Sequence, residues 1–94
     1  MEMAKVMKCD VKECAYNMDN LCHTIAITIG DDTNPMCDTF YRSSSKGGDA
    51  SSLACVGACK VSNCAHNKKL ECQAPGITVS YTKQEADCMT FEQR

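Results

Sequence analysis

Residues 9–17 read CDVKECAYN, and residues 59–67 read CKVSNCAHN. The two stretches lie 50 residues apart and share both cysteines, the valine, the alanine and the asparagine. Self-similarity at a fixed period is the signature of a duplicated structural unit. This stretch therefore decides how the rest of the chain is divided.

The repeat continues to the end of each unit. Eight of the nine cysteines fall into two matching sets, C-x4-C-x7-C-x14-C and C-x4-C-x7-C-x15-C. Residues 27–28 and 77–78 both read IT, and residues 39–40 and 90–91 both read TF. The one extra residue of the second set falls before its last cysteine, which indicates a loop at that point.

The chain is predicted to contain two tandem homologous modules, a first copy at residues 1–41 and a second copy at residues 55–94. Between them lies a linker, residues 42–54, which reads RSSSKGGDASSLA. Segments rich in glycine and serine behave as flexible coil. We therefore expect two separate modules on a tether. The alternative is that the linker packs or that the modules dock on each other.

Each copy is too small to fold on an aliphatic core alone. The chain has only two phenylalanines, three tyrosines and no tryptophan. Units of about 40 residues usually need disulfides, a metal or a partner to fold. The expected fold class is a small metal-stapled, β-rich module with short strands or hairpins and at most one-turn helices, present twice.

Two segments have the alternation of a strand with one buried face, residues 25–29 (IAITI) and 77–81 (ITVSY). Residues 39–40 and 90–91 are interpreted as short strands that return beside them. Each phenylalanine would then cover a small core; the expected members are Val11, Leu21, Ile27 and Phe40 in the first copy, and Val61, Leu70, Ile77 and Phe91 in the second.

Two further local signals concern turns. Residues 82–85 read TKQE, the form of a capping box, which predicts one helical turn before Cys88. Residues 33–35 read TNP at the corresponding place, so any helix there is expected to be shorter. Asn17 and Asn67 each follow a cysteine by three residues, and we expect them to brace a turn rather than to bind a ligand.

Four thiols per copy predict one metal ion per copy, and a closed site of four thiolates is a common structural zinc site. The predicted ligands are Cys9, Cys14, Cys22 and Cys37 in the first copy, and Cys59, Cys64, Cys72 and Cys88 in the second. Zinc binding to a finger-like peptide supplies about 10–16 kcal/mol of folding free energy. The expected cofactor is therefore zinc, two ions per chain.

The C-x4-C spacing does not select zinc by itself, because most zinc knuckles use C-x2-C. Two alternatives stay open, namely two disulfides per copy, and iron or copper in place of zinc. Iron–sulfur spacings built on C-x2-C do not fit the chain.

Three other candidate residues lack a matching counterpart. His23 corresponds to Gln73, and His66 corresponds to Tyr16, so both histidines are expected at the surface or in turns rather than at the metal. Cys55, which corresponds to Lys5, is expected to be a thiol without function. A swapped-in ligand, an intermolecular disulfide or a redox-sensitive residue are its alternatives.

Charge and hydropathy limit the partners. The net charge is −2 and the basic residues are scattered, so nucleic acid is not an expected partner. No apolar run approaches the roughly 20 residues that cross a membrane, and no signal peptide is visible. The expected location is the cytoplasm, where thiols stay reduced.

The pattern Cys-x-Val-x-x-Cys-Ala-Tyr/His-Asn, then Cys, Ile-x-Ile/Val and Cys-x-Thr-Phe, resembles the bacterial cysteine-rich family "domain of unknown function 1540". The resemblance covers both copies. It implies modules of about 40 residues, sometimes in tandem, with a metal site at each set of four cysteines. It implies no established activity and only a loose link to spores. Cys55 has no place in the pattern, and Glu71 stands where the first copy has Leu21.

Three functions are compatible with these observations. The first is a non-catalytic zinc-binding scaffold that presents loops to a protein partner. The alternatives are metal storage in the manner of a metallothionein and a disulfide-stapled structural protein, for example of a spore layer. An enzyme is not expected, because no C-x-x-C redox pair is present and four thiolates leave no open position on zinc.

Overall fold

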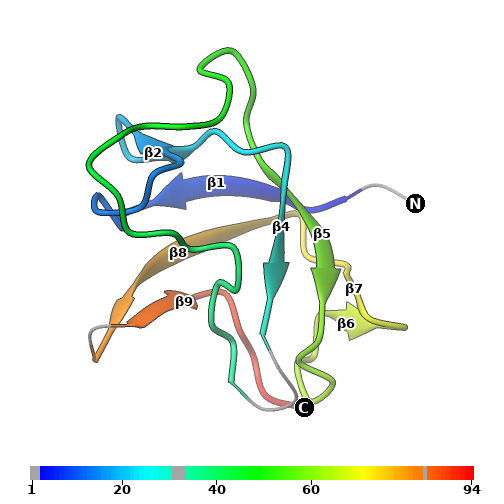
Figure 1. The fold of residues 1–94 in the computed structure, drawn as a ribbon. Coiled ribbons are helices and arrows are strands. Elements are labelled where there is room, and N and C mark those ends of the chain that lie inside the picture. The colour runs from blue at the N-terminus through cyan, green and yellow to red at the C-terminus, as the bar shows by residue number, and fades with distance from the viewer. Residues whose placement is uncertain (1–2, 31–33, 84) are drawn as a thin grey trace.

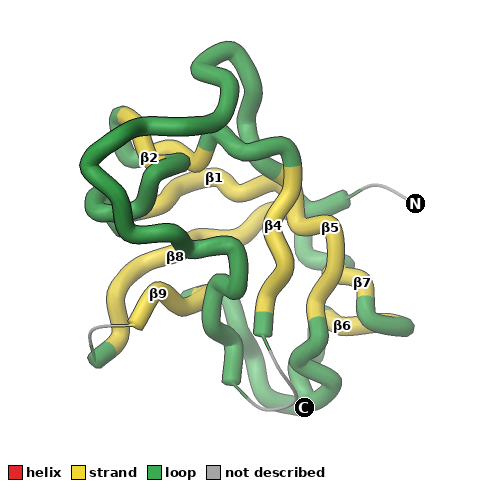
Figure 2. Tube along the Cα trace, viewed as in Figure 1, coloured by secondary structure: helices red, strands yellow, loops and turns green. Residues whose placement is uncertain are grey.

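The fold is all-β in the computed structural model, which describes residues 3–30, 34–83 and 85–94. These residues form nine strands, and none of them is helical (Figure 2). The β-rich expectation is therefore confirmed. Consistent with this, the described part of the chain has no helix capable of crossing a membrane.

Five strands form one sheet in the order β4-β5-β1-β8-β9. Their bounds are β1 Lys5–Cys9, β4 Ala26–Ile29, β5 Cys55–Cys59, β8 Gly76–Thr82 and β9 Glu85–Cys88. β1 runs parallel to β8, and β4 runs parallel to β5. Figure 1 shows these as two pairs of neighbouring strands that meet near the start of β1 and β5.

The sheet is built by exchange between the two copies. β1 of the first copy pairs with β8 of the second, and β5 of the second copy pairs with β4 of the first. The expectation of separate modules on a tether is therefore wrong. The division into two copies describes the sequence, whereas in the structure the hydrogen bonds of one sheet join them.

A pseudo-twofold axis relates the copies. Lys5 pairs with its own counterpart Cys55, and Met36 pairs with its counterpart Asp87, both in antiparallel fashion. Two equivalent residues can face each other in this way only where the axis passes between them. Cys55, half-buried in β5, therefore lies at the centre of the sheet and away from both sets of four cysteines.

The linker packs on the first copy instead of forming a flexible coil. The backbone N–H of Gly47 donates to the carbonyl of Ala15 at 2.8 Å, and that of Asp49 donates to the carbonyl of His23 at 2.9 Å. The His23 ring lies 2.8 Å from the carbonyl oxygen of Ser52. In Figure 1 this green stretch passes β2 before it enters β5. Backbone groups that find partners on the first copy thus hold the linker despite its composition.

Each copy also has a small β-hairpin between its second and third cysteines. The strands are β2 Asn17–Met18 with β3 Leu21–Cys22, and β6 Asn67–Lys68 with β7 Glu71–Cys72. The connecting pairs, residues 19–20 and 69–70, have positive φ at both positions. Two such residues are typical of a type I′ turn, whose twist matches that of the flanking strands.

The core is a single cluster to which both copies contribute. Ile27, Ile29, Ile77 and Val79 are buried while the residues between them are not, which confirms the predicted alternation at these positions. Ile25 and Tyr81, at the outer ends of the two predicted strands, are instead exposed. The two phenylalanines are half-buried and pack against this cluster, as expected. Leu70 is instead 54% exposed at its hairpin turn, and Leu21 is only half-buried, so the expectation that both belong to the core is wrong.

Two local predictions are wrong, one for a helical turn and one for short strands. Thr82 and Glu85 pair across the β8–β9 hairpin as strand residues and do not start a helix; Gln84 lies outside the described residues, as does Thr33 in the first copy. At Thr82 and Glu85, pairing between β8 and β9 overrides the local signal of a helix start. The segments 39–40 and 90–91 lie beside the central strands through hydrogen bonds to the Thr39 and Thr90 hydroxyl oxygens, but neither segment is a strand, and both threonines lie in turns.

Candidate metal centres

Each set of four cysteines lines one small cavity. The first cavity, of about 10 Å³, is bounded by Cys9, Cys14, Cys22 and Cys37. The second cavity, of about 20 Å³, is bounded by Cys59, Cys64, Cys72 and Cys88. A single water-sized sphere occupies roughly this volume, so each cavity has room for about one ion. The structure thus brings together the residues that the spacing grouped.

Four separate segments deliver the thiols of each set. In the first copy, Cys9 ends β1, Cys14 follows in a turn bridged to Arg42, and Cys22 ends β3. Cys37 pairs with Ile29 at the end of β4. The corresponding elements position the second set. Because β1 and β5 depend on exchanged partners, the arrangement is a product of the whole fold.

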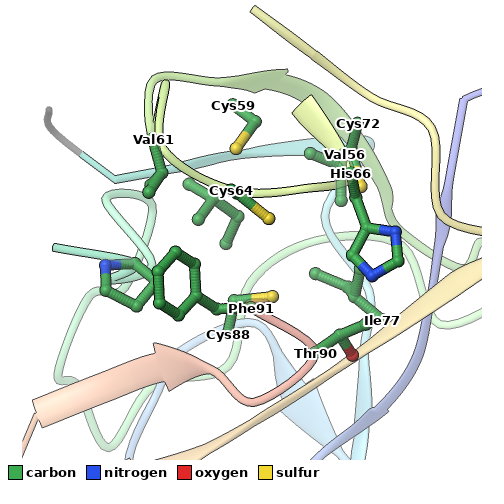
Figure 3. Close-up of a pocket in the computed structure, with 12 residues that line it drawn as sticks. Val56, Cys59, Val61, Cys64, His66, Cys72, Ile77, Cys88, Thr90 and Phe91 are labelled. Carbon is green, nitrogen blue, oxygen red and sulfur yellow. The ribbon is translucent and has the colours of Figure 1, made fainter. Parts of the chain in front are cut away.

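The walls of both cavities are mostly apolar. In the second cavity, Val61, Ile77 and Phe91 accompany the thiols. Figure 3 shows Cys59, Cys64 and Cys88 between the ring of Phe91 on one side and His66 on the other. In the first cavity, Tyr16 occupies the place of His66. Such surroundings limit the access of water to the sulfurs and strengthen electrostatic interactions inside.

Backbone amides are directed at the sulfurs. Five of the eight thiols accept a hydrogen bond from the N–H two residues further along the chain; the pairs are Cys9 with Val11, Cys22 with Thr24, Cys37 with Thr39, Cys72 with Ala74 and Cys88 with Thr90. A donor aimed at sulfur favours the thiolate over the thiol. Hydrogen bonds to ligand atoms are the outer support that metal sites generally require.

Burial dominates the electrostatics of the thiols. Together with smaller contributions from other thiols of the same set, it raises the pKa of Cys37 to about 12 and that of Cys88 to about 11. Burial also raises the pKa of Cys9, Cys22 and Cys72. Four thiolates in one apolar cavity would therefore be unstable without a compensating positive charge. A divalent, thiophilic cation fits this donor set.

The asparagines of the repeat support the first cysteine of each set. The side-chain amide of Asn17 donates to the carbonyl of Cys9 at 2.7 Å, and that of Asn67 donates to the carbonyl of Cys59 at the same distance. Asn67 also accepts a hydrogen bond from the N–H of Leu70, which agrees with the predicted turn-bracing role. Their contact with the cysteine backbone was missed, although their recurrence in both copies was the signal for it.

His66 lies in a turn as expected, whereas the expectation of a surface or turn position is wrong for His23. His23 is buried, and its ring nitrogens lie near the carbonyl oxygens of Ser52 and Met18, away from the thiols. His66 is half-buried and lines the second cavity, with Nε2 at 3.3 Å from a carboxylate oxygen of Glu92. His66 thus places an imidazole in the wall of the second cavity, and its counterpart Tyr16 offers no such nitrogen at the first.

All nine cysteines are unbonded to one another in the structure. In the described residues, no three side chains of Cys, His, Asp or Glu are already arranged as a ligand set for a metal ion. The thiols of each set nevertheless line one cavity wall.

The comparisons with known proteins identify the family. No match was found among curated proteins or among solved structures. The family model described as Domain of Unknown Function (DUF1540) matches residues 7–47 and 58–91, one segment in each half of the chain. The resemblance noted from the sequence is confirmed, and the chain belongs to the DUF1540 family, with two tandem copies of its domain.

Proposed function

We propose that each copy binds one structural metal ion, zinc by preference, through its four cysteines, and that the chain acts as a non-catalytic scaffold for a protein partner. The observation that carries the proposal is the meeting of four thiols from four separate segments at a cavity of about 10 to 20 Å³. Bound zinc would supply a positive charge and cross-link the segments. The proposal requires a compartment in which thiols stay reduced, such as the cytoplasm.

A closed site supports a structural role over a catalytic one. Catalytic zinc keeps a position open for water or substrate. Here the thiols are surrounded by Val61, Ile77 and Phe91 in the second cavity, with Val11, Ile27 and Phe40 at the first. Four thiolates inside such walls would fill the coordination sphere and leave the ion without a path to substrate. We therefore infer a non-enzymatic function.

The main competitor is a protein stapled by disulfides. The thiols of each set lie close enough to affect one another's pKa, so oxidation could link them in pairs as well. Metal storage is less well supported, because each cavity has the volume of about one ion and Cys55 is the only cysteine outside the two sets.

Native mass spectrometry of full-length protein purified without added metal tests the proposal. We expect two zinc ions per chain, both lost after treatment with a chelator. Two single variants, Cys14→Ser in the first copy and Cys64→Ser in the second, should each bind one zinc ion. The control variant Cys55→Ser should still bind two zinc ions. A metal-free mass that is lower by eight protons would reject the proposal and favour four disulfides, and more than two ions per chain would favour storage.

A further inference from the structure

Each cavity is completed by the other copy. Two residues of the second copy, Val79 and Ala86, line the first cavity beside the cysteines of the first copy. Their counterparts Ile29 and Pro35, from the first copy, line the second cavity. The contributions are therefore reciprocal and follow the pseudo-twofold axis. Neither copy alone contains the whole wall of its own candidate centre.

The reciprocity extends to the backbone of the fourth cysteine. The N–H of Cys37 donates to the carbonyl of Ala86 at 2.7 Å, and the N–H of Cys88 donates to the carbonyl of Pro35 at 2.7 Å. Pro35 lies two residues before Cys37, and Ala86 lies two residues before Cys88. Residues 35–37 and 86–88 thus form a closed pair of short segments, each holding the final ligand of the other copy.

The first cysteine of each set is held across the copies as well. The N–H of Asp10, next to Cys9, donates to the carbonyl of Val79 at 2.9 Å. The N–H of Lys60, next to Cys59, donates to the carbonyl of Ile29 at 2.8 Å. The strand that supplies a wall residue therefore also positions the backbone at the first ligand. Two of the four ligands of each set depend on backbone from the other copy.

We infer that the two centres are coupled, so that a metal ion bound by one copy raises the affinity of the other. The inference rests on the proposed metal function. An ion bound through Cys37 restrains the neighbouring Pro35 carbonyl, which accepts the hydrogen bond from the N–H of Cys88. In the other direction, an ion bound through Cys88 restrains the Ala86 carbonyl, which accepts the hydrogen bond from the N–H of Cys37. Binding at either centre thus orders part of the other, and linkage makes the effect equal in both directions.

The share of chains that carry one ion measures the coupling. Metal-free, reduced full-length protein is equilibrated with a zinc buffer, and its zero-, one- and two-ion species are counted by native mass spectrometry. Two equal, independent sites give about half of the chains with one ion at half loading, and unequal sites give more. A tenfold coupling lowers that share to about a quarter. A share of half or more overturns the inference.

A crossed variant tests the structural path. Ile29→Ala shrinks the wall of the second cavity from a position in the first copy. We expect it to expose Cys64 and Cys72 to alkylation at higher free zinc than in the unmodified chain, with the modified cysteines located by peptide mass spectrometry. The matched control is Ile25→Ala, because the Ile25 side chain is 82% exposed and lines neither cavity.

The outcomes separate the two proposals. If the cysteines of the first copy become open to alkylation before those of the second copy in Ile29→Ala, the structural path between the copies is rejected. Two zinc ions that bind with a one-ion share of half or more leave the metal function intact and reject the coupling. A chain that takes up no zinc in any of these experiments rejects the proposed function itself.

Discussion

The turns of the two small hairpins place different residues on the same left-handed backbone. Asp19 and Asn20 have φ values of 55° and 62°, and Lys69 and Leu70 have values of 54° and 67°. Asparagine and aspartate tolerate this conformation, whereas the Cβ of other residues meets the following carbonyl oxygen at a cost of roughly 1–2 kcal/mol. The second hairpin therefore has the less suitable turn sequence, and its exposed Leu70 gains little from packing.

Replacing Leu70 with the residue of the first copy should stabilise the protein. We expect Leu70→Asn to raise the free energy of unfolding by about 1 kcal/mol because it relieves the left-handed strain. At this chain length the melting temperature would rise by roughly 4–8 °C. Thermal unfolding at a fixed free zinc concentration measures it. The reverse change Asn20→Leu is the control and should lower stability; equal melting temperatures would contradict the explanation.

Metal binding should release protons in proportion to the thiols engaged. Burial raises the pKa of Cys37 from the ordinary 9.0 to about 12, so this thiol is protonated at pH 7 in the metal-free chain. Each thiol that becomes a ligand loses its proton, which predicts about four protons per ion at pH 7. Calorimetry of zinc binding in buffers of different ionisation enthalpy counts them.

The pH dependence follows from the same shift. Protons compete with the metal, so zinc affinity should increase as pH rises and the ions should be lost as pH falls. The metal-free fold should behave in the opposite way. Because the folded chain holds the proton of Cys37 more tightly than the unfolded chain does, stability is lost as pH rises through 9 and above. In the calorimetric measurement of proton release, fewer than two protons released per zinc ion would argue against a four-thiolate site.

Among the larger elements, the linker offers a matched pair of glycines. Gly48 has φ of 80°, and a Cβ there would lie 2.5 Å from the carbonyl oxygen of His23. At Gly47 a Cβ would only reach ordinary contact, 3.7 Å from the Tyr16 ring. The packing of the linker on the first copy thus requires glycine at residue 48 but not at residue 47.

We expect Gly48→Ala to destabilise the protein by about 1–3 kcal/mol, from backbone strain and the clash. Gly47→Ala should be neutral or stabilising by up to about 1 kcal/mol, because alanine restricts the unfolded chain. Urea unfolding at fixed free zinc compares the two. If the linker were free coil, both substitutions would have the same small effect.

The sequence predicts some elements well because their signal is local. Ile27 and Ile29 alternate with smaller residues, and that period is enough to identify β4 and its buried face. Residues 82–85 have an equally clear local pattern for a helix start, yet Thr82 and Glu85 pair as strand residues. What decides there is the burial of Ala86 and Cys88 against the sheet, which only the assembled fold reveals.

For the molecule as a whole, strand exchange makes the two copies one folding unit. β1 and β8 lie in different copies, as do β4 and β5, and these pairs carry most of the ladder between the copies. The connection through the linker holds the chain together covalently but contributes none of these hydrogen bonds. Cutting it should therefore leave the halves associated.

A protease site inserted between Ser44 and Ser45, both exposed, tests this expectation. After cleavage of the zinc-loaded protein, we expect the two halves to elute together in size-exclusion chromatography and to separate only in denaturant with chelator. The uncut insertion variant is the control for its effect on folding. Halves that separate under native conditions would favour independent modules.

The two candidate metal centres, like the strands, could be predicted from the sequence only in part. The recurrence of four cysteines per copy grouped the thiols correctly around two cavities. The sequence could not reveal that Val79 closes the first cavity and Ile29 the second, because contacts between copies leave no trace in the spacing of either one. His66, set aside for lack of a matching histidine, lines a cavity because Tyr16 fills the equivalent place with another ring.

The pairing of Lys5 with Cys55 on the pseudo-twofold axis has a consequence for dilution. Two separate chains with one copy each could form the same sheet only above the concentration set by their dissociation constant. A linker as short as residues 42–54 keeps the second copy at an effective concentration in the millimolar range. The assembled sheet therefore persists however few molecules of the protein a cell contains.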